Sequence, residues 1–332
     1  MNLYLGKAIR KGWLIIAAAF TSCVYQEEVP CPCDVRFVYD YNMEFADAFP
    51  KQVDDVTLFV FDSEGRFVSV HREQGDCLDA DYRMPLDLPA GQYHLVAWAG
   101  TAADKDCYRL TTSDLKPGTS TLHDLQLALN CTGTSHSKRL ADLWHGEVAE
   151  FNVCPYAPST VTVPLVKNTN RLKVMLQTVA GQPLLCEDYT FAIIDANYSF
   201  NYDNTLRDVP LLSYYPYQQK AVNIENDASR NPTVGTSALV AEMNTLRLMA
   251  DRSPRFVVRD NRSRQTLFDI NLRQYLDLMR LSDYADMPLQ EFLDRENTWH
   301  VILVMGQGSD GVPTILSLQI NAWKIVLNDN EL

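Results

Sequence analysis

Short apolar runs separated by turn residues dominate the chain from Asp34 onward. The runs 56–61 and 66–71 are rich in β-branched and aromatic residues, and they flank the four-residue turn 62–65 with its glycine. This arrangement predicts a β-hairpin. Other strand-like runs in this half of the chain lie at residues 35–39, 92–99, 122–129 and 147–153.

Residues 155–159 (PYAPS) interrupt this pattern, which then begins again. Strand-like runs follow at residues 161–166, 171–176, 189–194, 240–248, 255–259 and 265–270. Leu272, Leu276 and Met279 recur at the spacing of one helix face, and residues 288–295 form a second short helical stretch. The runs 298–305 and 314–327 then predict a terminal hairpin.

Strands this closely spaced, without a helix between each pair, predict an all-β fold of sandwiches. The 332 residues suggest two domains at roughly 150 residues each, and the apolar fraction of 46% is sufficient for packed cores. We therefore expect two tandem β-sandwich domains, at residues 34–158 and 159–332. The second would carry a short helical insertion before its closing strands.

The first residues have the composition of a secretory signal peptide. Lys7, Arg10 and Lys11 precede the apolar run 13–20, and two small residues stand directly before Cys23. A cysteine at this place is typical of a bacterial lipobox, so residues 1–22 are predicted to be a lipoprotein signal. Cys23 is then the predicted lipidation site. The alternative is an ordinary signal peptide followed by an unrelated cysteine.

Residues 23–33 would form a lipidated tether between the membrane and the first domain. The chain has 29 basic and 42 acidic residues, and loss of three basic residues with the signal leaves 26 against 42, a net charge of −16. A surface this acidic repels phosphate backbones and argues against nucleic-acid binding. The lipid, not charge, would hold the protein at the outer membrane.

The eight cysteines become seven if Cys23 is acylated, so at least one thiol has no partner within the chain. Cys77 and Cys107 flank a predicted hairpin of residues 82–87 and 92–100, which makes them the candidate disulfide. Cys31 and Cys33 are too closely spaced for the usual zinc-binding pair, and no second pair follows.

No motif of catalysis or cofactor binding stands out. Residues 306–311 match the glycine spacing of a dinucleotide-binding loop, but Val312 and Pro313 follow instead of a helix, so a hairpin loop is the better interpretation. Nucleophile-elbow, zinc-protease and phosphate-loop motifs are absent from the sequence, and the six histidines never fall at i, i+4. We predict neither an enzyme nor a protein with a metal or other cofactor, and we name no catalytic residue.

Several blocks, in this order, resemble the FimB-type fimbrial anchor lipoproteins of the Bacteroidales. They are residues 33–42 (CDVRFVYDYN), 56–65 (VTLFVFDSEG), 88–100 (LPAGQYHLVAWAG), 165–176 (LVKNTNRLKVML), 289–296 (LQEFLDRE) and 320–326 (INAWKIV). The resemblance covers residues 23–332. It implies two tandem transthyretin-like β-sandwich domains on a lipid anchor.

The same resemblance implies a role at the base of a surface fimbria, exposed on the outer membrane. The protein would attach the fimbrial shaft, limit its length, and join pilin subunits by β-strand complementation. The alternative is a surface lipoprotein that binds glycans or host ligands through loop aromatics, with Tyr214, Tyr215 and Tyr217 as candidates. A hydrolase is a third and weaker hypothesis, because a catalytic triad can be scattered through a sequence.

Overall fold

The structure is a computed structural model. It describes residues 31–102, 106–110, 115–154, 157–178, 183–224, 236–308 and 312–326. Strands account for most of these residues, and three short α-helices accompany them, so the predicted all-β class with a small helical insertion is confirmed. No helix among the described residues is long and apolar enough to cross a membrane.

The first half of the chain is built on a seven-stranded sheet with the order β3-β2-β5-β9-β10-β1-β4. Its strands are β1 (Cys31–Val38), β2 (Asp55–Asp62), β3 (Phe67–Gln74), β4 (Met84–Leu88), β5 (Gly91–Ala99), β9 (Trp144–Val153) and β10 (Ser159–Lys167). The first residues of β10 pair with β1 and its last residues pair with β9, so β10 belongs to both layers of a sandwich. The short helix α1 (Phe49–Gln52) lies between β1 and β2.

The second half contains two further sheets. The six-stranded sheet has the order β15-β16-β11-β19-β20-β21, and the five-stranded sheet has the order β18-β17-β12-β14-β8. The strands of the first are β11 (Thr169–Thr178), β15 (Gln218–Ile224), β16 (Thr236–Leu246), β19 (Thr298–Gln307), β20 (Pro313–Ile320) and β21 (Trp323–Val326). Those of the second are β8 (Ser135–His136), β12 (Tyr189–Asp195), β14 (Leu212–Tyr214), β17 (Arg255–Asp260) and β18 (Gln265–Asn271).

Strands of the first half pair with strands of the second half in two places. A small sheet joins β6 (Tyr108–Leu110) and β7 (Leu127–Leu129) of the first half to β13 (Ser199–Phe200) of the second. In addition β8, from the first half, runs parallel to β14 at the edge of the five-stranded sheet. One buried cluster accordingly contains side chains of both halves, for example Phe59 and Phe256.

The helical insertion agrees with the prediction. Helix α2 (Leu272–Asp283) buries Leu272, Leu276 and Met279, and its N-cap Asn271 accepts a hydrogen bond from the backbone of Gln274. Helix α3 (Leu289–Arg295) follows after a short loop. Single 3₁₀ turns lie at η1 (Leu122–Asp124) and η2 (Cys186–Asp188).

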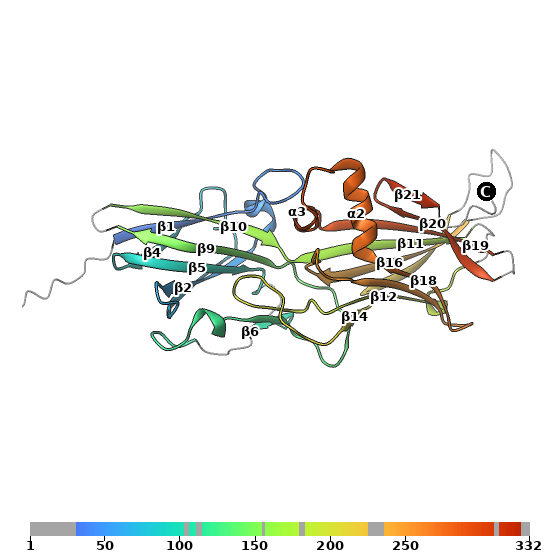
Figure 1. Ribbon diagram of the computed structural model, residues 1–332, viewed down its shortest axis with the longest axis horizontal. Helices are drawn as coiled ribbons and strands as arrows, with labels where there is room; N and C mark the ends of the chain where they lie inside the picture. The colour runs from blue at the N-terminus through green and yellow to red at the C-terminus, as the bar shows by residue number, and fades with distance from the viewer. Residues whose placement is uncertain are drawn as a thin grey trace, which may run out of the picture.

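Strands β10 and β11 follow each other with only Asn168 between them, and together they run through both halves along the long axis (Figure 1). β1 lies beside β10 and parallel to it, while β19 lies beside β11 and parallel to it. β1 and β10 run in the same direction, and β11 follows the last residue of β10. The first residues of β1 therefore lie at the end of the molecule that is remote from β11. Figure 1 shows β1 at one end and β19 and β20 toward the other.

One predicted strand pairing needs correction. The hairpin 56–61/66–71 is confirmed as β2 and β3, but the hairpin 82–87/92–100 is wrong, because β4 pairs with β1 while β5 pairs with β2 and β9. β10, which begins directly after the predicted limit of the first domain at Pro158, pairs with β1 and β9 of the first sheet, and the domain limits stay a prediction. Residues 31–33, assigned to the tether, belong to β1.

Candidate functional site

The predicted lipidation site, Cys23, and the predicted signal peptide 1–22 lie outside the described residues, so both stay predictions. The described chain begins at β1, where Cys31 is opposite Leu88. Cys33 is buried, and its thiol donates a hydrogen bond to the carbonyl of Leu86 (3.4 Å). The chain is therefore fixed within the sandwich from Cys33 on.

β1 has hydrogen-bonded neighbours on both sides. Val35, which is fully buried, lies opposite Val161 of β10 and opposite Met84 of β4. Alternate residues Val35 and Phe37 point into the core of the sandwich, as the alternation in the sequence predicts. A strand held by two ladders and a buried face resists removal from the sheet better than an edge strand does.

The loop that follows β1 is fastened to helix α3 of the second half. The guanidinium of Arg295 stacks on the ring of Tyr41 (4.1 Å to the centroid) and on that of Phe45 (4.6 Å). It also donates hydrogen bonds to the carbonyls of Asp40 and Asn42, each at 3.3 Å. The first half is thus bound to the helical insertion through one largely buried cation.

A second contact between the halves centres on Asp142. Its carboxylate binds the ammonium of Lys167 (3.2 Å) and the guanidinium of Arg171 (2.5 Å), at the end of β10 and the start of β11. The Lys167 ammonium also lies over the ring of Trp144, 5.0 Å from the centroid. Burial lowers the pKa of Lys167, and the adjacent Asp142 opposes that shift. Since the pair is largely enclosed, removing either partner would leave a poorly solvated charge.

Histidine and aromatic side chains complete the junction. Nε2 of His145 donates to the carbonyl of Tyr202 (2.7 Å), which fixes β9 to the loop after β13. Trp98 of β5 packs on Phe200 of β13 with 5.9 Å between ring centroids. These contacts join the two halves into one packed body.

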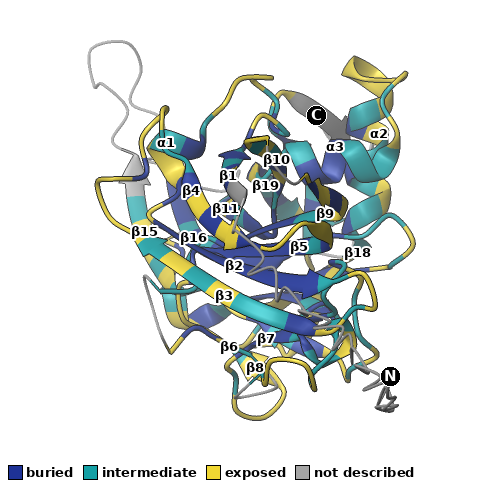
Figure 2. Cartoon of the chain, turned by 90° about the vertical axis from the view of Figure 1, so that its left-hand side faces the viewer, coloured by how far each residue is buried: buried dark blue, intermediate teal, exposed yellow. Residues whose placement is uncertain are grey.

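The strands at the sheet edges are the other surfaces of interest. In the pairings of the described residues, β3 and β4 end the first sheet, and β15 and β21 end the six-stranded sheet. Figure 2 shows β2 and β5 as buried strands, whereas β3 and β15 have alternating exposed positions. The register places Ile224, at the end of β15, beside Thr236 and therefore at the end of the molecule remote from β1. An open strand edge can accept an added strand.

The candidate disulfide is not formed in the structure. The Cys77 thiol is free and exposed, and it donates to the carbonyl of Gln74 (3.6 Å), just after β3. Cys107 is buried at the start of β6. The predicted pairing depends on a hairpin of β4 and β5, but β4 pairs with β1, and β5 pairs with β2 and β9.

The tyrosines proposed for glycan binding are largely structural. Tyr214 is fully buried and donates to the side chain of Asn197 (2.7 Å). Tyr217 donates to the carboxylate of Glu242 (3.0 Å). Tyr215 alone is exposed, so the segment does not present an aromatic binding surface.

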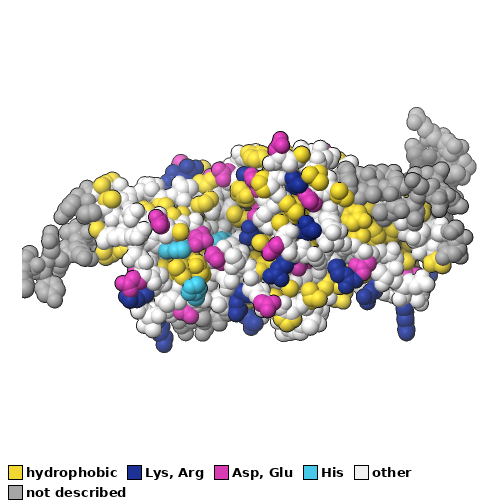
Figure 3. Space-filling model, viewed as in Figure 1, with side chains coloured by type: hydrophobic (Ala, Val, Ile, Leu, Met, Phe, Trp, Pro, Cys, Tyr) yellow, Lys and Arg dark blue, Asp and Glu magenta, His cyan; other side chains and the backbone are white. Residues whose placement is uncertain are grey.

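Titratable side chains form no recognisable catalytic or metal site in the part of the chain that the structure describes. No group of three or more histidine, cysteine or carboxylate side chains there could hold a metal ion. His94 is paired with Glu147 (2.7 Å), and Gly306 lies in strand β19, which strands β20 and β21 follow among the described residues. Basic and acidic side chains are mixed over the visible face of the molecule (Figure 3).

Comparison with protein families identifies the chain. Residues 27–329 match the model of the fimbrillin-A associated anchor proteins Mfa1 and Mfa2. The chain belongs to this family. The resemblance to fimbrial anchor proteins seen in the sequence is therefore confirmed. A search of curated proteins found no match.

Solved structures agree with this assignment. A candidate polysaccharide-binding protein of Bacteroides thetaiotaomicron is 35% identical, with a TM-score of 0.75, over 90% of this chain and 99% of that one. A candidate adhesin of the same organism is 32% identical, with a TM-score of 0.77 over the same shares. The fimbrial anchor protein Mfa2 of Porphyromonas gingivalis shares the fold, with a TM-score of 0.69 at 19% identity over 90% of this chain and 99% of that one.

Membership of this anchor family assigns the protein a role in fimbriae and a place at the cell surface, at the fimbrial base. It also indicates a structural rather than an enzymatic protein. Sequence reasoning missed the residues that join the halves, Arg295 above all. Arg295 lies in the block 289–296 that carries the family resemblance. That block alone does not show which loop the arginine contacts.

Proposed function

We propose that the protein is an outer-membrane lipoprotein, acylated at Cys23, that attaches a fimbria at the cell surface and limits its length. Pilin subunits would join it by β-strand complementation. The observation that carries this proposal is the way β1 is held, since β1 is the first strand after the predicted lipid. β10 and β4 flank it on both sides, and the loop that follows it is bound to Arg295.

Tension between a membrane and a shaft would pull the N-terminus along the direction of β1. The hydrogen bonds to β10 and β4 would then be loaded in shear, so many of them must break together rather than one at a time. The continuous path of β10 and β11 leads the load into the six-stranded sheet of the second half. The Asp142 and Arg295 contacts prevent the halves from separating at their junction.

The edge of β15 supports strand complementation at the far end. β16 is its strand partner, and its opposite edge has no strand neighbour in the described pairings. Each main-chain hydrogen bond to an added strand contributes about 0.5–1.5 kcal/mol, and several of them sum along the strand. An anchor with its lipid at one end and its acceptor edge at the other would end a fimbria rather than extend it. This is how it would limit length.

The first test is genetic. Cys23→Ala should shift the protein from the detergent-soluble membrane fraction to the medium and release fimbriae with it. Cys77→Ala, which alters an exposed thiol far from the signal, is the matched control and should leave fimbriae attached. Deletion of the whole protein should lengthen the fimbriae seen by electron microscopy. Attached fimbriae of normal length in the Cys23→Ala strain would contradict the proposal.

The second test locates the complemented edge. A photo-crosslinking amino acid at Lys220, an exposed position of β15, should join to a pilin subunit in intact cells. The same amino acid at Val70, an exposed position of the β3 edge, is the matched control and should not. A crosslink from Val70 and none from Lys220 would move the acceptor edge to the first half. No crosslink from either position would reject complementation at these edges.

A further inference from the structure

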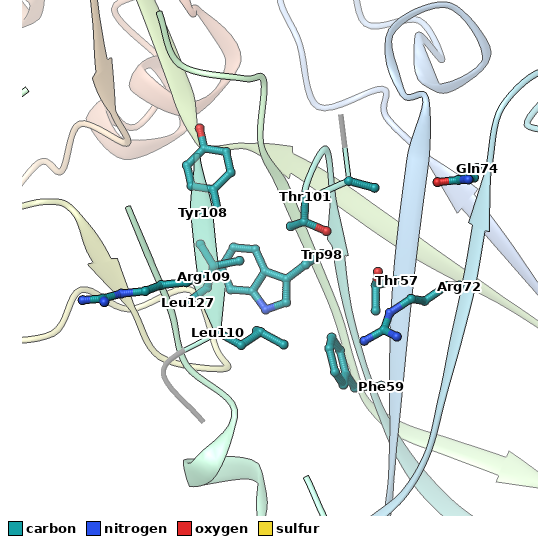
Figure 4. Close-up of a pocket in the computed structure, with 11 residues that line it drawn as sticks. Thr57, Phe59, Arg72, Gln74, Trp98, Thr101, Tyr108, Arg109, Leu110 and Leu127 are labelled. Atoms are coloured by element: carbon teal, nitrogen blue, oxygen red, sulfur yellow. The ribbon is translucent and has the colours of Figure 1, made fainter. Parts of the chain in front are cut away.

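A cavity of about 400 Å³ lies on the outer face of the first sheet, between that sheet and the small sheet that joins the halves. Thr57 and Phe59 of β2, Arg72 of β3 and Trp98 of β5 line one side of it, while Leu110 of β6 closes the other (Figure 4). The volume is at the lower end of the range for small-molecule sites, which is about 300–1,000 Å³. No part of the anchoring role uses this cavity.

The floor of the cavity contains a polar group without a partner. Trp98 is only 1% exposed, and its indole Nε1 is buried with no hydrogen-bond acceptor. Figure 4 shows this nitrogen facing the space between Leu110 and Phe59. Buried polar groups are nearly always hydrogen-bonded in folded proteins, and an exception in a cavity points to a bound ligand with an oxygen atom at that position.

The mouth of the cavity carries positive charge. Arg72 is exposed, lies opposite Thr57 in the strand register, and forms no ion pair with any residue the structure describes. Figure 4 shows its guanidinium beside Phe59, whereas Arg109, at the opposite wall, extends away from the other side chains. None of the described lining residues is acidic, although the chain has a net charge of −13. The carboxylate of Asp55, nearby, accepts hydrogen bonds from the backbone of Thr101 and Ala102.

We propose that this cavity binds a carboxylated sugar, such as one hexuronate residue of an acidic polysaccharide. Arg72 would hold the carboxylate, for which its planar fork of donors is suited. The indole N–H of Trp98 would donate to a hydroxyl or ring oxygen. Phe59 and Leu110 would contact the apolar face of the sugar ring, and the Thr57 hydroxyl and Gln74 amide would bind its remaining hydroxyls.

The balance of donors and acceptors favours a sugar over a peptide. Among the lining side chains, Arg72, Arg109 and the indole of Trp98 can only donate, whereas the neutral oxygens of Thr57, Gln74 and Thr101 can accept. The backbone N–H groups of an acidic peptide only donate, so they add donors to a wall whose two charged groups already donate. Sugar hydroxyls both donate and accept, so they can satisfy a donor-rich wall.

The test is calorimetric binding to the purified full chain in detergent micelles. The probes are a trimer of galacturonic acid, its methyl ester and free galacturonic acid. We expect the trimer to bind, and the uncharged ester to bind at least about tenfold more weakly because it lacks the charge-assisted hydrogen bonds to Arg72. Binding of the free sugar would show that one residue suffices. Binding of the trimer alone would show that the site needs a polymer.

Variants and a peptide probe complete the design. Arg72→Gln should weaken trimer binding at least about tenfold, and Lys220→Gln, an exposed cation on β15, is the matched control and should not change it beyond twofold. The proposal is overturned if neither acid binds, if acid and ester bind equally, if Arg72→Gln binds as the wild type does, or if tetraglutamate binds in place of the trimer. Fimbrial attachment is scored separately, so failure of sugar binding leaves the anchoring proposal as it stands.

Discussion

The side chains of Asn168 and Asn204 bind each other reciprocally at the junction of the two halves. The amide of Asn168 donates to Oδ1 of Asn204 (2.6 Å), and that of Asn204 donates to Oδ1 of Asn168 (3.1 Å). Both residues are buried, and Asn204 has a left-handed backbone with φ of 63°. Asparagine tolerates this conformation better than most residues with a side chain do.

We expect Asn168→Ala to lower the free energy of unfolding by about 1–3 kcal/mol, because it leaves the amide of Asn204 buried without its partner. Urea unfolding followed by tryptophan fluorescence measures this loss. Asn201→Ala, which removes a single hydrogen bond to Thr205 at a partly exposed position, is the control and should cost less. Equal losses of unfolding free energy in the two variants would show that the reciprocal pair contributes no more to stability than the single hydrogen bond of Asn201.

Arg295→Ala should release the loop after β1. The substitution removes two aromatic contacts, two hydrogen bonds to backbone carbonyls and an ion pair with Glu291 (2.7 Å), for an expected loss of about 1–3 kcal/mol. Hydrogen exchange should quicken in residues 40–47 and in α3. Arg295→Lys keeps the positive charge but lacks the planar guanidinium. Hydrogen exchange in residues 40–47 that is intermediate between the wild type and Arg295→Ala would separate the contribution of the charge from that of the guanidinium contacts. Unchanged exchange in Arg295→Ala would show that the loop is held by other contacts.

His145 should make the protein less stable in acid. Burial lowers its pKa to about 4, with Arg247 acting in the same direction and Glu147, Asp203 and the carbonyl of Tyr202 opposing it. An unfolded histidine titrates near pH 6.5. Between about pH 6.5 and pH 4 the unfolded chain therefore binds more protons, so this residue's contribution to stability falls as the pH falls, by about 3 kcal/mol in total.

His145→Gln retains a donor for the carbonyl of Tyr202 and removes the titration. The unfolding free energy of this variant should fall less between pH 7 and pH 4 than that of the wild type. His300→Gln, at an exposed strand position, is the control and should leave the pH profile unchanged. A His145→Gln profile parallel to that of the wild type would contradict the assignment.

Asp195 should have the opposite effect on the pH dependence of stability, because its contribution falls as the pH rises. Burial raises its pKa to about 6, and one of its oxygens, Oδ2, is buried without a hydrogen-bond partner. The unfolded carboxyl ionises near pH 3.9, so this residue lowers stability progressively as the pH rises from about 4 to about 6. Asp195→Asn should therefore stabilise the protein at pH 8 by about 1–3 kcal/mol and little at pH 4. Asp208→Asn, at an exposed position, should show no such dependence.

Gly146 of β9 lies close against β10. A β-carbon there would lie 2.6 Å from Val163 and 2.7 Å from both Leu165 and the carbonyl of Pro164. Gly146→Ala should therefore cost about 1–3 kcal/mol through overpacking, as measured by thermal unfolding. Gly91→Ala is the matched control, because its β-carbon would meet only ordinary contacts with Tyr93. A neutral Gly146→Ala would show that the two strands can move apart.

Local patterns predicted much of this fold. The turn 62–65 with its glycine specified the β2–β3 hairpin, and the helix-face spacing of Leu272, Leu276 and Met279 specified the buried side of α2. In both cases the partners are close in sequence, so the pattern contains the whole interaction. The ordered sequence blocks then led to the correct family.

Long-range pairings escaped the prediction. β4 and β5 resemble a hairpin because they are adjacent, yet β4 completes its hydrogen bonds with β1. The strands exchanged between the halves, β8 and β13, are two residues each and leave almost no pattern. The cavity around Trp98 could not be predicted for the same reason, since its walls come from strands distant in sequence.

The join of β10 to β11 has a consequence for recombination between relatives. In β10 the buried positions are odd-numbered, as at Val163 and Leu165. In β11 they are even-numbered, as at Leu172 and Val174. Because side chains alternate with a period of two, gain or loss of one residue at Asn168 would turn the apolar set of one half toward water. Chimaeras between anchors of different species should therefore be viable only when the spacing across Asn168 is retained.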